Sequence, residues 1–162
     1  MRKSANPTTC EDHKVVVLGV GNLLLGDEGI GVLAVRHLAA TDLTDRAEFV
    51  DGGTGSLQLL GYFQNRPRLF LIDAAMDGNP PGTVSHLKPR FASDFPRSLS
   101  AHDIGLRDLI ETASLTGDLP RIDLITVSVE TPQSLTLEVS APVKRALDVI
   151  EIKVRELLAE DE

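Results

Sequence analysis

The stretch VVVLGVGNLLLGDEGIGVLAV, residues Val15 to Val35, decides the fold of this chain. It opens with a β-branched run typical of a strand buried on both faces, and it closes with the spacing of an amphipathic helix. A glycine-containing turn joins the two and carries adjacent carboxylates, Asp27 and Glu28, to the start of the helix. A helix N-terminus attracts negative charge, which a ligand phosphate or a protein carboxylate can supply. Carboxylates at this place favour a cation over a nucleotide as the ligand.

The turn also departs from the G-x-G-x-x-G pattern of dinucleotide-binding loops. Gly19 and Gly21 occupy the first two glycine positions, but Leu24 stands at the third. The two carboxylates would in addition repel a pyrophosphate. A purely structural alternative stays open, in which Asp27 is the N-cap of the helix and Glu28 complements its dipole.

Strands and helices are predicted to alternate along the chain, which indicates βαβ units and a mainly parallel sheet. The predicted strands are 14–18, 47–50, 68–72, 121–129 and an edge strand at 83–87; the predicted helices are 30–40, 56–63, 103–115 and 140–159. We therefore expect an α/β three-layer sandwich, a twisted and mostly parallel sheet with helices on both faces. Residues 1–12 are expected to form a flexible N-terminal extension, and 13–162 a single α/β domain.

Composition excludes several classes of function. The net charge of −8 argues against nucleic-acid or anionic-membrane partners. An aromatic content of 4% without Trp argues against a surface on which the bases of single-stranded nucleic acid stack. Cys10 is the only cysteine, so no intrachain disulfide can form. We find no apolar run of membrane-spanning length and no signal-peptide core, so the cytoplasm is the expected location.

Acidic residues recur where strands are predicted to end. The second predicted strand runs into Asp51 and the third into Asp73, while His102 precedes a predicted helix. Ligands of open α/β sheets bind outside the carboxyl ends of the strands, so these side chains and Glu28 should meet at one rim. Two carboxylates and an imidazole suit a divalent transition metal. Each of these residues also has a plausible structural role by itself, in a loop or before a helix.

At these residues the chain resembles the hydrogenase maturation endopeptidases, which process the large subunit of nickel–iron hydrogenases. Four blocks match in the family's order: GVGNLLLGDEGIG (19–31), DGGT (51–54), LIDAA (71–75) and SAHDIGL (100–106). The resemblance implies removal of a short C-terminal extension from the large-subunit precursor after nickel insertion. It also implies that Glu28, Asp73 and His102 contact the metal.

Nickel would belong to the substrate and be sensed by the protease, although another divalent metal could bind in vitro. Asp51 is our candidate for a supporting or water-activating role, while the identity of the water-activating group stays open. Supporting loop residues are expected at Gly21, Asn22, Asp27, Gly52 and Gly53, with the two last glycines allowing the substrate backbone to approach. The alternatives are a nickel-delivery metallochaperone without protease activity, a nucleotide-dependent oxidoreductase and a broad-specificity peptidase.

Overall fold

The computed structural model describes residues 15–55, 57–99, 106–130 and 134–160; the expected N-terminal extension lies outside these ranges. Within them, one sheet is formed by β1 (Val15–Gly19), β2 (Glu48–Asp51), β3 (Arg68–Ala75), β4 (Val84–Leu87) and β5 (Arg121–Ser128). The strands lie in the order β2-β1-β3-β5-β4. All neighbours pair in parallel except β4, which pairs antiparallel with β5. β4 lies at an edge of the sheet, as predicted.

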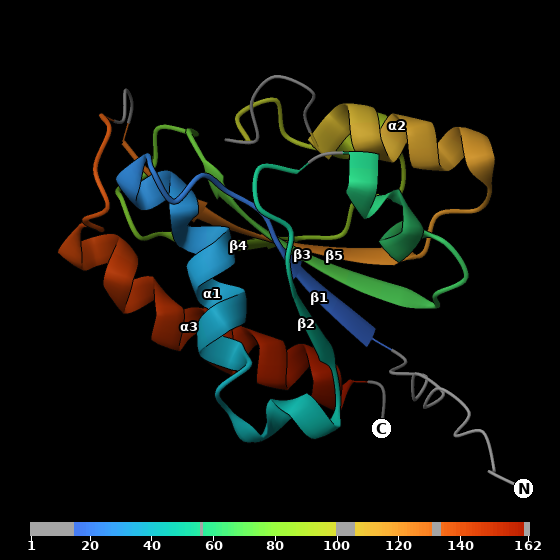
Figure 1. Cartoon of the computed structure of the whole chain (residues 1–162), viewed down its shortest axis with the longest axis horizontal. Coiled ribbons are helices and arrows are strands. Elements are labelled where there is room, and N and C mark those ends of the chain that lie inside the picture. Colours follow the sequence, from blue (N-terminus) through green and yellow to red (C-terminus); the bar gives the residue numbers. More distant parts are fainter. Residues whose placement is uncertain (1–14, 56, 100–105, 131–133, 161–162) are drawn as a thin grey trace, which may run out of the picture.

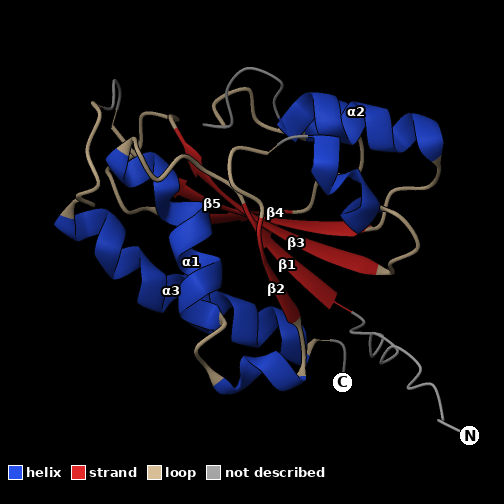
Figure 2. Ribbon diagram, in the orientation of Figure 1, coloured by secondary structure: helices blue, strands red, loops and turns tan. Residues whose placement is uncertain are grey.

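Helices cover both faces of this sheet (Figures 1 and 2). One face packs against α1 (Ile30–Leu38) and α3 (Ala141–Ala159), and the other against α2 (Leu106–Thr116) and the 3-10 helix η3 (Leu57–Phe63). Alternate strand residues point to opposite faces. Val17 and Phe70 therefore join the core under α1 and α3, whereas Leu18 and Leu71 join the core under α2. The three-layer α/β sandwich is confirmed.

Most predicted elements are present with shifted bounds, and the third strand is the instructive error. We predicted that it ends before Asp73, but β3 continues to Ala75. The extension arises because Asp73 and Ala75 pair with Thr126 and Ser128 of β5. Asp73 thus lies inside a central strand. Strand pairing overrides the low strand propensity of aspartate here.

Strand order reverses between β1 and β3. From β1 the chain passes to β2 on one side, then returns to β3 on the other side of β1. This reversal is the switch point at which open α/β sheets bind ligands, outside the carboxyl ends of the strands. The turn after β1 and the last residues of β3 both lie at this point.

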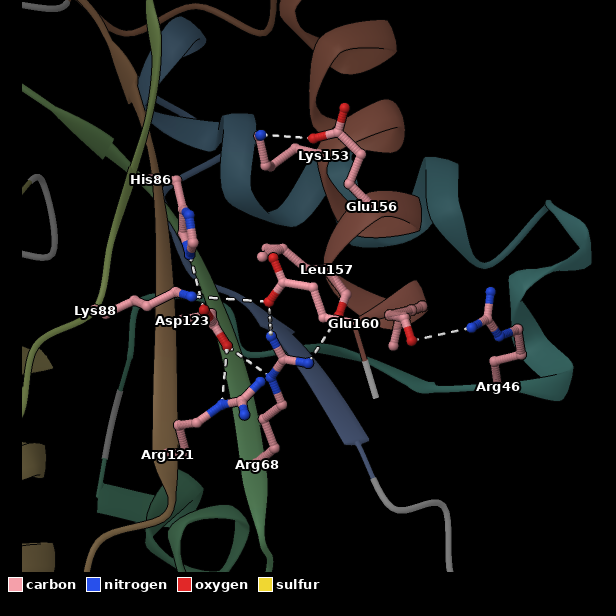
Figure 3. A network of polar contacts seen from close by, with 11 residues as sticks. Arg46, Arg68, His86, Lys88, Arg121, Asp123, Lys153, Glu156, Leu157 and Glu160 are labelled. Atoms are coloured by element: carbon pink, nitrogen blue, oxygen red, sulfur yellow. Dashed lines mark hydrogen bonds and ion pairs between the residues drawn. The ribbon is translucent and has the colours of Figure 1, made fainter. Parts of the chain in front are cut away.

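A buried ionic cluster occupies the opposite, amino end of the sheet (Figure 3). Arg68 Nε donates to Asp123 Oδ2 at 2.7 Å, and His86 Nε2 lies 2.8 Å from Asp123 Oδ1. Arg68 Nη1 also donates to the carbonyl of Leu157, near the end of α3. Burial alone would raise the pKa of Asp123, but the hydrogen bonds from Arg68 and His86 outweigh it and hold the pKa below its usual value. The cluster therefore joins β3, β4, β5 and α3.

None of the helices in the described ranges is both long enough and apolar enough to cross a membrane.

Candidate active site

The turn after β1 is a short 3-10 helix, η1 (Gly26–Gly29), in which both Asp27 and Glu28 are buried. The sequence interpretation placed Asp27 as a candidate N-cap of the first helix. The structure contradicts it, because α1 begins at Ile30 and its N-cap, Gly29, makes no side-chain capping bond. The carboxylate of Asp27 instead accepts hydrogen bonds from the backbone N–H of Ser140 at 2.7 Å and from its hydroxyl at 2.8 Å.

Asp73 is fully buried inside β3. Its Oδ1 accepts a hydrogen bond from the N–H of Ala74 at 2.8 Å, which fixes the orientation of the carboxylate. The residues on either side of it, Ile72 and Ala74, are apolar, so the carboxyl side chain lies in an otherwise hydrophobic part of the strand at the switch point. Such placement is typical of functional carboxylates rather than of solvated surface acids.

Backbone contacts bring the Glu28 turn and Asp73 together. The N–H of Val20 donates to the carbonyl of Ile72, immediately before Asp73, at 2.9 Å. The η1 turn packs against β3. Gly31 permits this approach, because a Cβ there would lie 2.1 Å from the Val20 oxygen and 2.3 Å from the Ile72 oxygen. The predicted convergence of the first and third acidic segments is therefore present in the backbone.

Asp51 lies at the end of β2 and is exposed. Its Oδ2 accepts from Arg36 Nη2 at 2.8 Å and from Arg36 Nε at 3.1 Å, while Oδ1 accepts from the Gly53 N–H at 3.0 Å. These bonds couple the acid to α1 and to its own turn. The contacts support a positioning role for Asp51; a water-activating role stays a prediction.

The supporting-loop residues connect the turn after β1 to the turn after β2 by backbone hydrogen bonds. Gly21 donates its N–H to the Gly53 carbonyl at 2.7 Å, and Gly52 donates to the Gly19 carbonyl at 2.8 Å. Asn22 Oδ1 accepts from the N–H of Leu24, which closes a local turn. A Cβ on Gly52 would press on core side chains, whereas one on Gly53 would meet nothing within 4 Å. A side chain at Gly53 would thus point into open space and one at Gly52 into the core, and approach by a substrate backbone at the two glycines stays a prediction.

His102, the third predicted metal contact, lies outside the described residues. Within the described ranges, no three His, Cys, Asp or Glu side chains gather as a metal site. The donor set of Glu28, Asp73 and His102 would nevertheless fit a transition metal, since it combines carboxylates with an imidazole. Beyond the ends of β3 and β5 lies a depression of about 380 Å³, lined by Met76, Asn79 and Glu130 among others.

Sequence reasoning missed two parts of this site region. The first is Ser140, for which the only signal was its place before a predicted helix. The second is the segment around Thr136, whose N–H donates to the Leu24 carbonyl and whose carbonyl accepts from the Gly26 N–H, both at 2.9 Å. Neither contact has a local signature, because the partners lie more than a hundred residues apart.

The fold and the site together define a doubly wound α/β protein with buried carboxylates at its switch point. The sequence model of the hydrogenase maturation protease family, HycI, matches residues 32–156. The chain is 37% identical over 150 residues to the hydrogenase 2 maturation protease of Escherichia coli (strain K12), an alignment that covers 88% of this chain and 92% of the relative. This chain belongs to the hydrogenase maturation protease family.

Solved structures agree with this assignment. The hydrogenase maturating endopeptidase HybD from E. coli superposes with a TM-score of 0.78 at 32% identity, covering 91% of this chain and 93% of that one. The [NiFe] hydrogenase maturation protease HybD from Thermococcus kodakarensis gives a TM-score of 0.73 at 25% identity, covering 89% and 98%. The chain is therefore a maturation endopeptidase, and so a hydrolase.

Proposed function

We propose that this protein removes the C-terminal extension of a nickel-loaded nickel–iron hydrogenase large-subunit precursor, in the cytoplasm. The observation that carries the proposal is the joining of the Glu28 turn to the Asp73 strand at the sheet's switch point, in a chain of this family. The relatives' names speak of hydrogenase maturation, and the precursor is the substrate that such an activity requires.

In this proposal Glu28, Asp73 and His102 contact the nickel carried by the precursor. Binding the metal places the scissile peptide beside the protease and makes cleavage conditional on prior nickel insertion. Two buried carboxylates and an imidazole supply the negative charge and the nitrogen donor that a divalent transition metal prefers.

Cleavage then follows as hydrolysis. A water molecule, activated by a carboxylate or by the substrate's nickel, attacks the carbonyl carbon of the scissile peptide. The C–N bond breaks, the water proton passes to the leaving amine, and the released products are a shortened large subunit and a short peptide. Asp51 supports this arrangement through its bonds to Arg36 and Gly53.

A cleavage assay with the purified protein tests the proposal. Nickel-loaded and nickel-free precursor are incubated separately with the protease, and the mass of the large subunit is followed over time. We expect shortening of the loaded precursor alone. The variant Glu28→Gln should be inactive, whereas Asp118→Asn, an exposed acid beyond α2, should match the wild type.

Three results would count against the proposal. Absence of cleavage from matched precursors, together with tight binding of free nickel, would favour the metallochaperone alternative. Equal cleavage of loaded and nickel-free precursor would remove the nickel requirement. Turnover of unrelated unfolded proteins would indicate a broad-specificity peptidase.

A further inference from the structure

Three large leucine side chains are exposed next to the Glu28 turn. Leu24, Leu135 and Leu137, which we call the leucine patch, expose 59%, 82% and 76% of their surface. Two chain segments far apart in sequence carry them and lie side by side (Figure 1). A cluster of exposed apolar side chains on a protein marks an interaction surface more often than an isolated one does.

Backbone pairing explains why the three leucines share a face. Leu25 and Thr136 form an isolated parallel bridge, held by hydrogen bonds from Thr136 to Leu24 and from Gly26 to Thr136. Side chains alternate along paired segments, so the neighbours of the bridge point the same way. Leu25 and Thr136 are accordingly half-buried while the leucines of the patch are exposed.

Both chain segments of the patch connect to the candidate active site. On one side, Leu24 leads through Gly26 directly into Asp27 and Glu28. On the other, the segment after Leu137 reaches Ser140, whose N–H and hydroxyl bind the Asp27 carboxylate. A molecule held on the leucine patch is therefore held beside the acids.

A groove of about 460 Å³ continues the patch between α1 and α3. Leu137 belongs to both surfaces, and apolar side chains of the two helices, Ile30 and Leu147 among them, line the groove. Glu138 and Lys144 supply one charge of each sign at its lining. The surface is thus apolar with a balanced charge, which suits an uncharged apolar segment of polypeptide.

We propose that the leucine patch and this groove bind an apolar segment of the hydrogenase large-subunit precursor and hold it while the extension is cut. This inference rests on the proposed function. Its occupant is the substrate because the patch borders the turn that carries the acids and is joined to it by the Leu25–Thr136 bridge and the Ser140–Asp27 hydrogen bonds, so only a molecule processed there benefits from the placement. A second copy of this chain is disfavoured, because each copy carries a net charge of −8.

The test compares a double variant of the patch with a single variant of a similarly exposed leucine elsewhere on the surface. The double variant Leu135→Gln/Leu137→Gln removes apolar surface from the patch without touching the core. Leu115→Gln is the matched control, since Leu115 is 88% exposed and lies on α2, across the sheet. Binding of nickel-loaded precursor and the KM and kcat of its cleavage are measured for each protein.

We expect the double variant to bind the precursor roughly tenfold more weakly, because the leucines of the wild type bury apolar surface against the precursor and the glutamines do not. KM should rise by the same factor at unchanged kcat. The control should match the wild type in both measurements. A double variant with the affinity and KM of the control overturns the inference. So does light scattering that shows a wild-type dimer dissociated by the double substitution.

Failure of the proposed function gives a different result. If the wild type binds precursor without cutting it, the proposed reaction is wrong, and the affinities of the two variants still decide the role of the patch. If the wild type neither binds nor cuts, both proposals are overturned.

Discussion

Both carboxylate oxygens of Asp27 accept hydrogen bonds from one residue, Ser140, which lies 113 positions later in the chain. Ser140 is the residue before α3, yet its hydroxyl makes no capping bond to that helix. The hydroxyl is committed to Asp27 instead. The start of α3 is thereby tied to η1, the turn that carries Glu28.

This pairing predicts that Asp27 positions Glu28. Ser140→Ala should cost about 2 kcal/mol of unfolding free energy, because it leaves one oxygen of the buried Asp27 carboxylate without its bond. Asp27→Ala should cost less, because Ser140 is exposed and water can replace the lost partner. Asp27→Asn should retain most of the processing rate, since an amide can accept from the backbone N–H and donate to the hydroxyl. Urea unfolding and the kcat of precursor cleavage measure the two effects. Additive losses in the Asp27→Ala/Ser140→Ala double variant would show that the two residues act independently.

Substitution of the proposed metal contacts should separate chemistry from folding. Glu28→Gln, Asp73→Asn and His102→Ala are expected to lower precursor cleavage by at least about a hundredfold, because each removes a donor to the substrate's nickel. Circular dichroism should show folded protein in every case. A variant that processes precursor at the wild-type rate would remove that residue from the site.

Asp51 and Arg36 can be tested as a pair. We expect Asp51→Asn and Arg36→Gln to lower cleavage by similar and modest factors and to change stability by about 1 kcal/mol or less, because the ion pair is exposed. Cleavage kinetics and thermal melts give the comparison. A loss of activity confined to Asp51→Asn and exceeding about a hundredfold would instead assign water activation to this carboxylate.

Gly31 should tolerate no side chain. Gly31→Ala forces a Cβ against the carbonyl oxygens of Val20 and Ile72, so we expect about 2 kcal/mol or more of destabilisation and a loss of processing. Gly61→Ala is the control, because a Cβ there meets nothing within 4 Å. Denaturant midpoints for the two variants check the prediction, and equal midpoints would contradict it.

The ionic cluster around Asp123 should contribute to stability in a pH-dependent way. The pKa of Asp123 is held below its ordinary value of 3.8. The contribution of Asp123 to the unfolding free energy is therefore fully present above pH 3.8 and is lost as the pH falls through the lowered pKa. Asp123→Asn should cost roughly 3–5 kcal/mol near neutral pH, because Arg68 and His86 lose a buried anionic partner.

Urea unfolding at a series of pH values measures this effect. The difference in unfolding free energy between the wild type and Asp123→Asn should become smaller as the pH is lowered below about 4. Asp118→Asn, an exposed acid, is the control and should show no such narrowing. A constant difference across the series would mean that the charge of Asp123 contributes nothing.

The alternation of strands and helices was predictable because it depends on the spacing of apolar residues within each segment. The run around Val17 and the stripe through Ile150 both form the elements expected of them. The edge strand expected at 83–87 is present as β4. These are properties of single segments, and the buried patterns of the segments confirm them.

What escaped prediction depends on pairing between distant segments. The extension of β3 past Asp73 is set by β5, and the partner of Asp27 is set by the path of the chain before α3. Asp123 looked like an ordinary strand residue because its partners, Arg68 and His86, come from other strands. No local pattern contains this information.

β3 carries a buried charge near each of its ends, Arg68 at the first position and Asp73 at the sixth. At the rise of a β-strand they are separated by about 16 Å along the strand, with apolar side chains between them. Arg68 is paired with Asp123, which cancels most of its charge, so little electrostatic influence of the pair reaches Asp73 over that length. Substitutions at the amino end of the sheet can therefore be used to raise the melting temperature without changing the environment of Asp73, the acid proposed to contact the substrate's nickel.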